Sequence, residues 1–308
     1  MRTNLVVAAI FALVASAVVV GLNRERSEHR IGEPDHPKTY APPKFSDADH
    51  PVSVSTAPTP GVSAGIVRLL NESNNLKAFA DHAKQHPEQG GLAYAANVTI
   101  YCTGVRESVA QLRKQAAKIA ASNQATANRR LAAIDELERR CQGFGPNESG
   151  IALLHEGIAR GDVVLAAKER LAQTRGLPFE QQLPVAKEAL ALRDPQVIQA
   201  LMSLGVTSDE TSKEPPVNYL DGKPFGGLSP RDYTTAWNVA LCSFGWDCVS
   251  SRSEQVLEAC AAQNRCAANF LDVLRGDYRN DPDRWQQVMN TASRLVSVLG
   301  ASELIYNK

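Results

Sequence analysis

The stretch LCSFGWDCVSSRSEQVLEACAAQNRC, residues 241–266, carries four of the six cysteines in the chain. Their spacing is C-x5-C-x11-C-x5-C, whereas structural zinc sites usually bring two thiolates together across roughly two to four intervening residues. No histidine follows His155, so neither a further zinc ligand nor a base for a cysteine nucleophile is close in sequence. The stretch therefore predicts disulfide bonds.

The pairing that we favour joins cysteines within each C-x5-C unit. Six residues of a continuous helix span about 9 Å, more than the roughly 4.4–6.8 Å that separates bridged Cα atoms. Gly245 and Asn264, however, can each end a helix in the left-handed conformation and turn the chain back. The main alternative crosses the two units with each other. The favoured pairs are Cys242–Cys248, Cys260–Cys266 and, by elimination, Cys102–Cys141.

The start of the chain predicts export, which agrees with oxidised cysteines. Residues 5–22 are an uninterrupted apolar run, long enough to span a bilayer as an uncleaved inner-membrane anchor. Alternatively, Ala15-Ser16-Ala17 has the form of a signal-peptidase site, and cleavage near Ala17 would release the rest of the chain. Because the cytosol keeps thiols reduced, we expect an extracytoplasmic protein, which in a Gram-negative bacterium would be periplasmic.

Composition changes several times along the chain. The segment before Ala64 is rich in proline and poor in large apolar residues, so it cannot bury enough surface to offset its ordering entropy. From Ala64 onward, alanine and leucine recur at helical spacing, with one proline- and glycine-containing interruption. The expected divisions are a signal peptide or membrane anchor (1–30), a disordered linker (31–63), a helical subdomain (64–205), a long loop (206–228) and a cysteine-rich helical subdomain (229–308).

Helix boundaries are clear within the helical part. Ser229-Pro230, Asp194-Pro195 and Asp281-Pro282 each place a capping residue before proline at the first helical position. Ser251 and Glu254 have the spacing of a capping box. Because no run of β-branched residues alternates convincingly with polar ones, the sequence predicts an all-α fold. We expect antiparallel helix pairs, in an α-solenoid-like array or an irregular bundle, stapled by disulfides.

Two resemblances accompany this pattern. Asp162 and Asp194 stand 32 residues apart, each after a helix end and a tight turn. Over about 60 residues this is similar to tetratricopeptide-like helical repeats, without the tryptophan, tyrosine and proline pattern of that family. The stretches NLKAFADHAKQHPEQGGLAYAANVTIYC and LCSFGWDC resemble uncharacterised secreted α-helical proteins of proteobacteria. That resemblance implies an exported helical protein and no particular activity.

Beyond the cysteines, the sequence offers no recognisable catalytic, cofactor-binding or metal-binding residues. His82 and His86 have the spacing of a metal-binding pair, but Pro87 follows them, so we interpret both as surface residues. Asp135 and Glu138 lie among arginines and are interpreted as salt-bridged surface groups. The 33 acidic residues balance the 33 basic ones, which argues against a nucleic-acid partner and against a strongly membrane-adhering surface.

Two functions fit these observations. The preferred hypothesis is a non-enzymatic binding or structural module of the cell envelope, displayed outside the cytoplasm and acting on a protein or cell-wall partner. The alternative is an envelope hydrolase, directed for instance at glycan, whose carboxylates the fold brings together from distant segments. A deep pocket with paired, partly buried carboxylates would favour the enzyme, and shallow helical grooves would favour the module.

Overall fold

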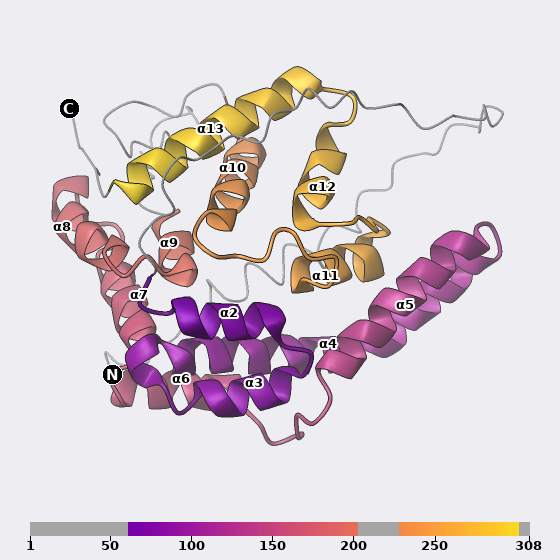
Figure 1. Ribbon diagram of the computed structural model, residues 1–308, viewed down its shortest axis with the longest axis horizontal. Coiled ribbons are helices and arrows are strands. Elements are labelled where there is room, and N and C mark those ends of the chain that lie inside the picture. The colour runs from indigo at the N-terminus through magenta and orange to yellow at the C-terminus, as the bar shows by residue number, and fades with distance from the viewer. Residues whose placement is uncertain (1–60, 203–227, 302–308) are drawn as a thin grey trace. The chain divides into compact units, whose positions relative to one another are not determined.

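The computed structural model describes residues 61–202 and 228–301. These residues form twelve α-helices and two short 3-10 helices, with no strand among them (Figure 1). The all-α prediction is therefore confirmed for this part of the chain. The predicted apolar span 5–22, the linker before Gly61 and the loop 206–228, apart from its last residue, lie outside the described residues.

Short turns and capped ends separate the helices of the described part. None of these helices has both the length and the apolar character needed to cross a bilayer. The elements are α2 (Ala64–Glu72), α3 (Leu76–Ala83), η2 (Pro87–Gln89), α4 (Gly91–Ala120), α5 (Gln124–Arg140), α6 (Gly150–Ala159), α7 (Val163–Gln173), α8 (Phe179–Leu190), α9 (Pro195–Leu201), α10 (Pro230–Cys242), α11 (Glu254–Gln263), α12 (Phe270–Arg275), η3 (Gly276–Tyr278) and α13 (Pro282–Gly300).

The proline-marked helix starts are confirmed. Ser229 caps α10 in a capping box with Asp232, and proline holds the first helical position. The side chain of Asp194 caps α9, and that of Asp281 caps α13. Asp162 caps α7 in the same way. These starts could be predicted because cap and helix are adjacent in sequence.

The capping box expected from Ser251 to Glu254 is wrong. α11 begins at Glu254, its N-cap is Ser253, and the Ser253 hydroxyl makes no capping hydrogen bond. The reason lies just before the helix, where Asp247 accepts two backbone N–H groups and Ser250 accepts one. These side chains hold the backbone in a turn of its own, so the helix starts later than the box requires.

Three apolar clusters form the core. The largest draws on both sides of the undescribed gap at 203–227, from α4 and α6–α9 to α10–α13, and includes the fully buried Trp237. Within it α10 packs along α13 (Figure 1). A second cluster joins α2 and α3 to the first half of α4, and a third joins α4, α5 and α11.

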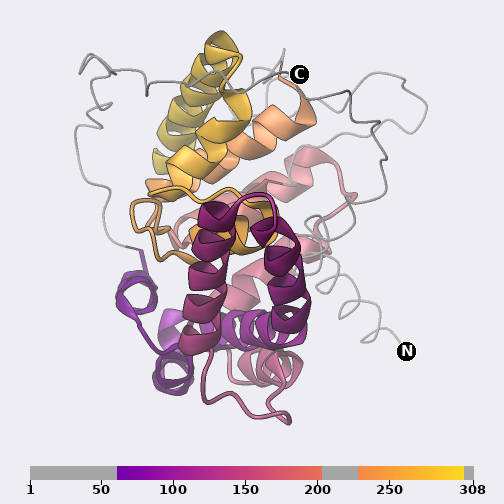
Figure 2. The same ribbon diagram turned by 90° about the vertical axis from the view of Figure 1, so that its right-hand side faces the viewer.

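α4 and α5 form a long antiparallel hairpin. α4 has 30 residues, and the segment from Gly91 to Val105 holds all but one of its buried side chains. Beyond Val105 only Ala116 of α4 is buried, and this half packs on α5, which in turn carries α11. Figure 2 looks onto the far end of the hairpin, where residues 121–123 turn the chain.

Three disulfides join the six cysteines, in the three pairs that the sequence favours. Their Cα atoms lie 5.2 Å apart in Cys102–Cys141, 5.6 Å in Cys242–Cys248 and 4.1 Å in Cys260–Cys266. The long bridge ties the middle of α4 to the residue that follows α5. Each short bridge folds the chain back at the end of a helix.

The two short bridges depend on left-handed residues, as expected. Gly245 has φ of 108°, and hydrogen bonds from Gly245 to Cys242 and from Trp246 to Leu241 make the Schellman pattern at the end of α10. Asn264 ends α11 with φ of 59° and ψ of 27°. In both places the left-handed residue reverses the chain and brings the second cysteine back to the helix.

Candidate functional site

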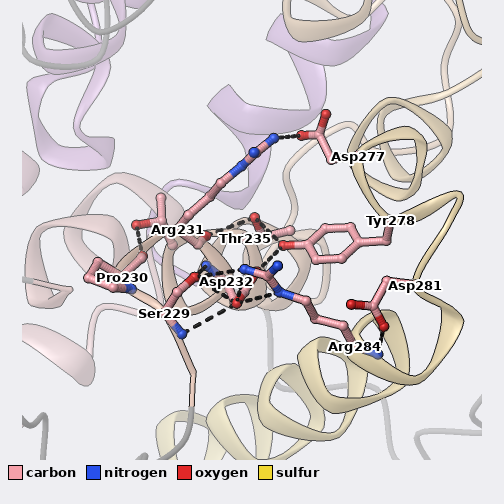
Figure 3. A network of polar contacts seen from close by, with 10 residues as sticks. Ser229, Pro230, Arg231, Asp232, Thr235, Asp277, Tyr278, Asp281 and Arg284 are labelled. Carbon is pink, nitrogen blue, oxygen red and sulfur yellow. Dashed lines mark hydrogen bonds and ion pairs between the residues drawn. The ribbon is translucent and has the colours of Figure 1, made fainter.

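A network of polar groups around one buried carboxylate joins α10, η3 and α13 (Figure 3). At its centre lies the carboxylate of Asp232, which is 3% exposed. Its Oδ1 accepts a hydrogen bond of 2.7 Å from the Tyr278 hydroxyl, and its Oδ2 accepts one of 2.9 Å from Arg284 Nε. Oδ2 also lies 2.8 Å from Arg284 Nη2 and accepts the Ser229 hydroxyl at 2.7 Å. Three elements therefore meet on one carboxylate.

Burial and hydrogen bonding act in opposite directions on Asp232. Burial acts to raise its pKa, but hydrogen bonds from Arg284, Ser229 and Tyr278 outweigh it and hold the pKa below its usual value. The hydrogen bond to Asp232 raises the pKa of Arg284, and burial raises the pKa of Tyr278. At neutral pH the network thus holds a carboxylate ion, a guanidinium and a neutral phenol.

A cavity of about 290 Å³ lies beside this network and is lined by polar residues only, namely Ser229, Asp232, Asp281, Asp283, Arg284 and Gln287. Asp281 already has a hydrogen-bond partner there, since its Oδ1 accepts a bond of 3.0 Å from the backbone N–H of Arg284. The Ser229 hydroxyl donates to Asp232, but a carboxylate with a lowered pKa is a weak base. The contact therefore holds the start of α10 and does not activate the hydroxyl as a nucleophile.

A second group of ion pairs lies next to the first. Asp277 of η3 contacts Arg231 at 2.7 Å and Arg265 at 3.2 Å. Arg265 stands beside Cys266, so this pair links η3 to the bridged end of α11 as well as to α10. The two groups together fasten α10, α11, η3 and α13 to one another.

Two further carboxylates are fully buried and cap helices. Asp162 accepts four backbone hydrogen bonds of 2.8–3.3 Å, two at the start of α7 and two at the start of α4. Its pKa is raised by burial, against the effect of these four donors. One side chain therefore satisfies N–H groups of two helices that are about seventy residues apart.

Asp194 caps α9 and holds the first described residues. Its Oδ1 accepts the N–H of Val197 at 2.9 Å, and its Oδ2 accepts the hydroxyls of Tyr94, at 2.7 Å, and of Ser63. Ser63, the last residue of the predicted linker, is 1% exposed. The chain that arrives from the linker is therefore fixed to α4 and α9 at this carboxylate.

Lys168 lies close to Asp162 and Asp194, in a polar part of the core. Burial lowers the pKa of Lys168, against the charges of these two acids. Its ammonium group donates to Gln196 at 3.3 Å, and Gln196 also accepts the amide of Asn97 at 2.8 Å. These side chains connect α4, α7 and α9.

A third polar cluster lies where α4 and α5 meet the start of α11. Arg140 donates from Nη1 to the carbonyl oxygen of Arg252 at 2.6 Å and from Nη2 to that of Ser73 at 3.2 Å. The Tyr101 hydroxyl is buried here, and the charges of Glu254 and Arg140 both act on it. The long disulfide follows directly, because Tyr101 precedes Cys102 and Arg140 precedes Cys141.

This cluster gathers buried polar atoms without hydrogen-bond partners in the described part of the chain. They are Tyr101 Oη, Arg140 Nε, Ser253 Oγ and Glu254 Oε1. Burial raises the pKa of Glu254; Arg140 acts against this shift and the charge of Glu258, one turn along α11, adds to it. Glu254 and Glu258 are thus a carboxylate pair whose first member takes up a proton more readily than an exposed glutamate.

Arg130 binds the opposite end of α11. The residue is 4% exposed, and its guanidinium donates to the carbonyl oxygen of Ala261, from Nε at 2.9 Å and from Nη2 at 2.6 Å. This carbonyl group belongs to the last turn of α11, where the carbonyl oxygens have no hydrogen-bond donor within the helix. Because Arg130 and Arg140 both lie on α5, one helix holds both ends of another.

The other residues that the sequence singles out lie on the surface. Asp135 and Glu138 both pair with Arg113, at 2.8 and 2.7 Å, which confirms their interpretation as salt-bridged groups. The rings of His82 and His86 have their centroids 4.8 Å apart at the end of α3. Within the described residues no group of three or more His, Cys, Asp or Glu side chains could hold a metal ion.

Sequence reasoning missed the Asp232 network and the two arginines of α5. The signal for Asp232 was its place three residues after Ser229, which predicts a cap but not the ion pair with Arg284, 52 residues away. No local signal distinguishes Arg130 and Arg140 from their exposed neighbours. Their partners are backbone carbonyls between 67 and 131 residues away, and carbonyls leave no trace in a sequence.

Comparison with protein-family models, with curated proteins and with solved structures finds no match for this chain. The function is therefore inferred from the residues themselves. Three disulfides indicate an oxidising compartment outside the cytoplasm, because cytosolic thiols are kept reduced.

Proposed function

We propose that this chain is a non-enzymatic binding or structural module of the cell envelope, displayed outside the cytoplasm by its N-terminal segment. The observation that carries the proposal is the state of three buried carboxylates, Asp162, Asp194 and Asp232. Each accepts hydrogen bonds from helix starts or from neighbouring elements. Groups engaged in this way position helices and are poorly placed to transfer protons.

The proposed arrangement is a helical body on a tether. Residues 5–22 anchor it in the inner membrane, with cleavage near Ala17 and secretion as the alternative. The three bridges suit a body that works outside the cytoplasm, in the periplasm of a Gram-negative cell. The partner is a protein or the cell wall.

The first test is the location and oxidation state of the full chain in its native cell. After free thiols have been blocked, the intact mass should show no added alkyl group without reductant and six after reduction. Fractionation should recover the chain with membranes, and protease added outside the inner membrane should cleave it. Six reactive thiols without reductant, or a cytosolic chain, would contradict the proposal.

The second candidate is an envelope hydrolase, and Glu254 is the observation that favours it. A carboxyl with a raised pKa, beside a second carboxylate at Glu258, has the composition of an acid and base pair for glycan hydrolysis. Purified chain should then release soluble fragments from cell-wall glycan, and both Glu254→Gln and Glu258→Gln should abolish the release. Release that neither variant reduces would exclude this pair as its source.

A further inference from the structure

The far end of the α4–α5 hairpin is basic. Residues 108–134 contain five Lys or Arg residues and no Asp or Glu, although the chain as a whole is electrically balanced. This stretch runs from the outer half of α4 through the turn at 121–123 to the first half of α5. We call residues 113–130 the hairpin end.

Two of the five cations have internal roles. Arg113 pairs with Asp135 and Glu138 across the hairpin, and Arg130 is buried against the last turn of α11. Both contacts join neighbouring helices and thus hold the hairpin end in a fixed position relative to α11. The bridge Cys260–Cys266 fastens the adjacent end of α11.

The other three cations have no acidic partner in the described part of the chain. Lys114 and Lys118 are exposed one turn apart on α4, and Arg129 is exposed on α5. Arg129 makes a contact of 3.4 Å with the Thr126 hydroxyl and no ion pair. Exposed side chains between them are small, as at Ala117, so a flat charged surface could approach the helices closely.

We propose that the hairpin end binds the anionic lipid headgroups of the membrane that anchors this chain. The inference rests on the anchor in the proposed function. Three uncompensated cations without a nearby acid are complementary to an anionic surface, and each improves such binding about fivefold. A lipid surface is favoured over an acidic protein because the anchor keeps lipid within reach of the body at all times.

The length of the tether supports this choice. About 38 residues separate the apolar run from Gly61, and a chain of that length reaches at most roughly 130 Å. The tether reaches the body at Ser63, which shares Asp194 with Tyr94 near the start of α4, and the hairpin end lies at the other end of α4, roughly 40 Å away at about 1.5 Å per residue. The tether therefore keeps the whole body, hairpin end included, at a high effective concentration near the membrane. A body that turns about this attachment can bring the hairpin end to the surface, where the attraction of the three cations adds to the effect of the tether.

The test uses the full chain reconstituted by its N-terminal segment in vesicles of phosphatidylcholine alone or with about 30% phosphatidylglycerol. A photo-crosslinking amino acid replaces Ser122 in the hairpin turn, and lipid adducts are counted by mass spectrometry. We expect at least about fivefold more adducts on the anionic vesicles, and loss of this excess at high salt, since the attraction is electrostatic.

Charge reversal provides the matched comparison. The variant Lys114→Glu, Lys118→Glu, Arg129→Glu should lose the excess of adducts on anionic vesicles. The control makes the same change of net charge at three exposed cations elsewhere in the described part and should keep it: Arg68→Glu, Arg175→Glu and Lys187→Glu. Equal numbers of adducts on the two kinds of vesicle would overturn the proposal, and so would an excess that survives reversal of the hairpin end. The same crosslinking amino acid can be used in whole cell envelopes, where adducts with a protein in place of lipid would also overturn it.

Failure of the anchor can be told apart from failure of the hairpin end. A chain that does not float with phosphatidylcholine vesicles lacks the anchor of the proposed function. Headgroup binding would still be supported in that case if the chain floated with anionic vesicles and reversal of the hairpin end abolished this flotation. Flotation with neither kind of vesicle would overturn it.

Discussion

Tyr94 and Tyr101 lie on the same helix, α4, and their hydroxyl groups differ in whether they have a hydrogen-bond partner. The Tyr94 hydroxyl donates to Asp194 at 2.7 Å, whereas the buried Tyr101 hydroxyl has no partner in the described part of the chain. Losing a hydrogen bond to a charged group costs about 1.5–3 kcal/mol, whereas removing an unpaired buried hydroxyl costs nothing or stabilises. We therefore expect Tyr94→Phe to lower the free energy of unfolding and Tyr101→Phe to leave it unchanged or raise it, measured by urea denaturation.

The two variants control for each other, since both remove one buried hydroxyl from a tyrosine of α4. If Tyr101→Phe destabilised as much as Tyr94→Phe, its hydroxyl would have a partner such as a bound water molecule. The unpaired atoms of Arg140, Ser253 and Glu254 would then be the first groups to examine around that water.

Asp232 supports a second prediction at this scale. Asp232→Asn removes the charge that Arg284 and Tyr278 share, and we expect it to lower the free energy of unfolding by about 2–3 kcal/mol at neutral pH. A carboxyl whose folded pKa is lowered stabilises above its ordinary value of 3.8 and loses this effect as the pH falls. The difference from the unmodified chain should therefore shrink below about pH 4. The control Asp283→Asn, in the same cavity, should cost less than about 1 kcal/mol.

At the scale of elements, Glu136 ties α5 to the segment before α11. Hydrogen bonds from Arg139, aided by Arg252, outweigh burial and lower its pKa from 4.5 to about 2. Its contribution to stability is complete above pH 4.5 and is lost as the pH falls to about 2. We expect Glu136→Gln to be less stable at pH 7, by about 1–2 kcal/mol because both arginines are half exposed, and to lose less stability on acidification.

Thermal unfolding followed from pH 7 to pH 2 would measure this. Glu107→Gln, at an exposed acid on the hairpin, is the control and should follow the unmodified chain. If Glu136→Gln lost as much stability between pH 7 and pH 2 as the unmodified chain, the contacts with Arg139 and Arg252 would not persist in solution.

The disulfides should rank by the loops that they close. Cys102–Cys141 closes 39 residues and each short bridge closes six. In the chain-entropy model these loops correspond to about 4 and about 2.2 kcal/mol. We expect the double serine variant of the long bridge to lose more stability, by urea denaturation, than that of Cys242–Cys248. The reverse order would show that the short bridge acts by holding the turn at Gly245 in the folded state.

How far the sequence predicts these elements depends on the separation of the groups involved. Caps such as Ser229 and the turn-back bridge at Asn264 join residues within about six positions, so spacing and residue type identify them. The contact of Arg130 with Ala261 joins residues 131 apart, and it depends on how α11 lies across α5. The start of α11 shows where such prediction fails. The spacing of Ser251 and Glu254 favours a capping box, but side chains in the preceding turn make the helix begin later.

At the scale of the whole molecule, the described body shares one principal core. The largest apolar cluster contains Leu201, before the undescribed gap, and Trp237, after it, and both are fully buried. Composition alone suggested two subdomains, 64–205 and 229–308, joined by a loop. A shared core instead predicts that the two halves lose their structure together, because neither keeps its buried surface without the other.

The tryptophans allow this to be measured without labels. All three lie in the second half, at Trp237, Trp246 and Trp285, whereas far-ultraviolet circular dichroism reports helices of both halves. We expect fluorescence and circular dichroism to give the same urea midpoint and the same slope. As a control, Leu201→Ala, in the first half, should shift both midpoints equally, since a cavity in a shared core weakens both halves. Two results would instead establish two independently folding subdomains. One is a circular dichroism midpoint at higher urea than the fluorescence midpoint, and the other is a fluorescence midpoint that does not change in Leu201→Ala.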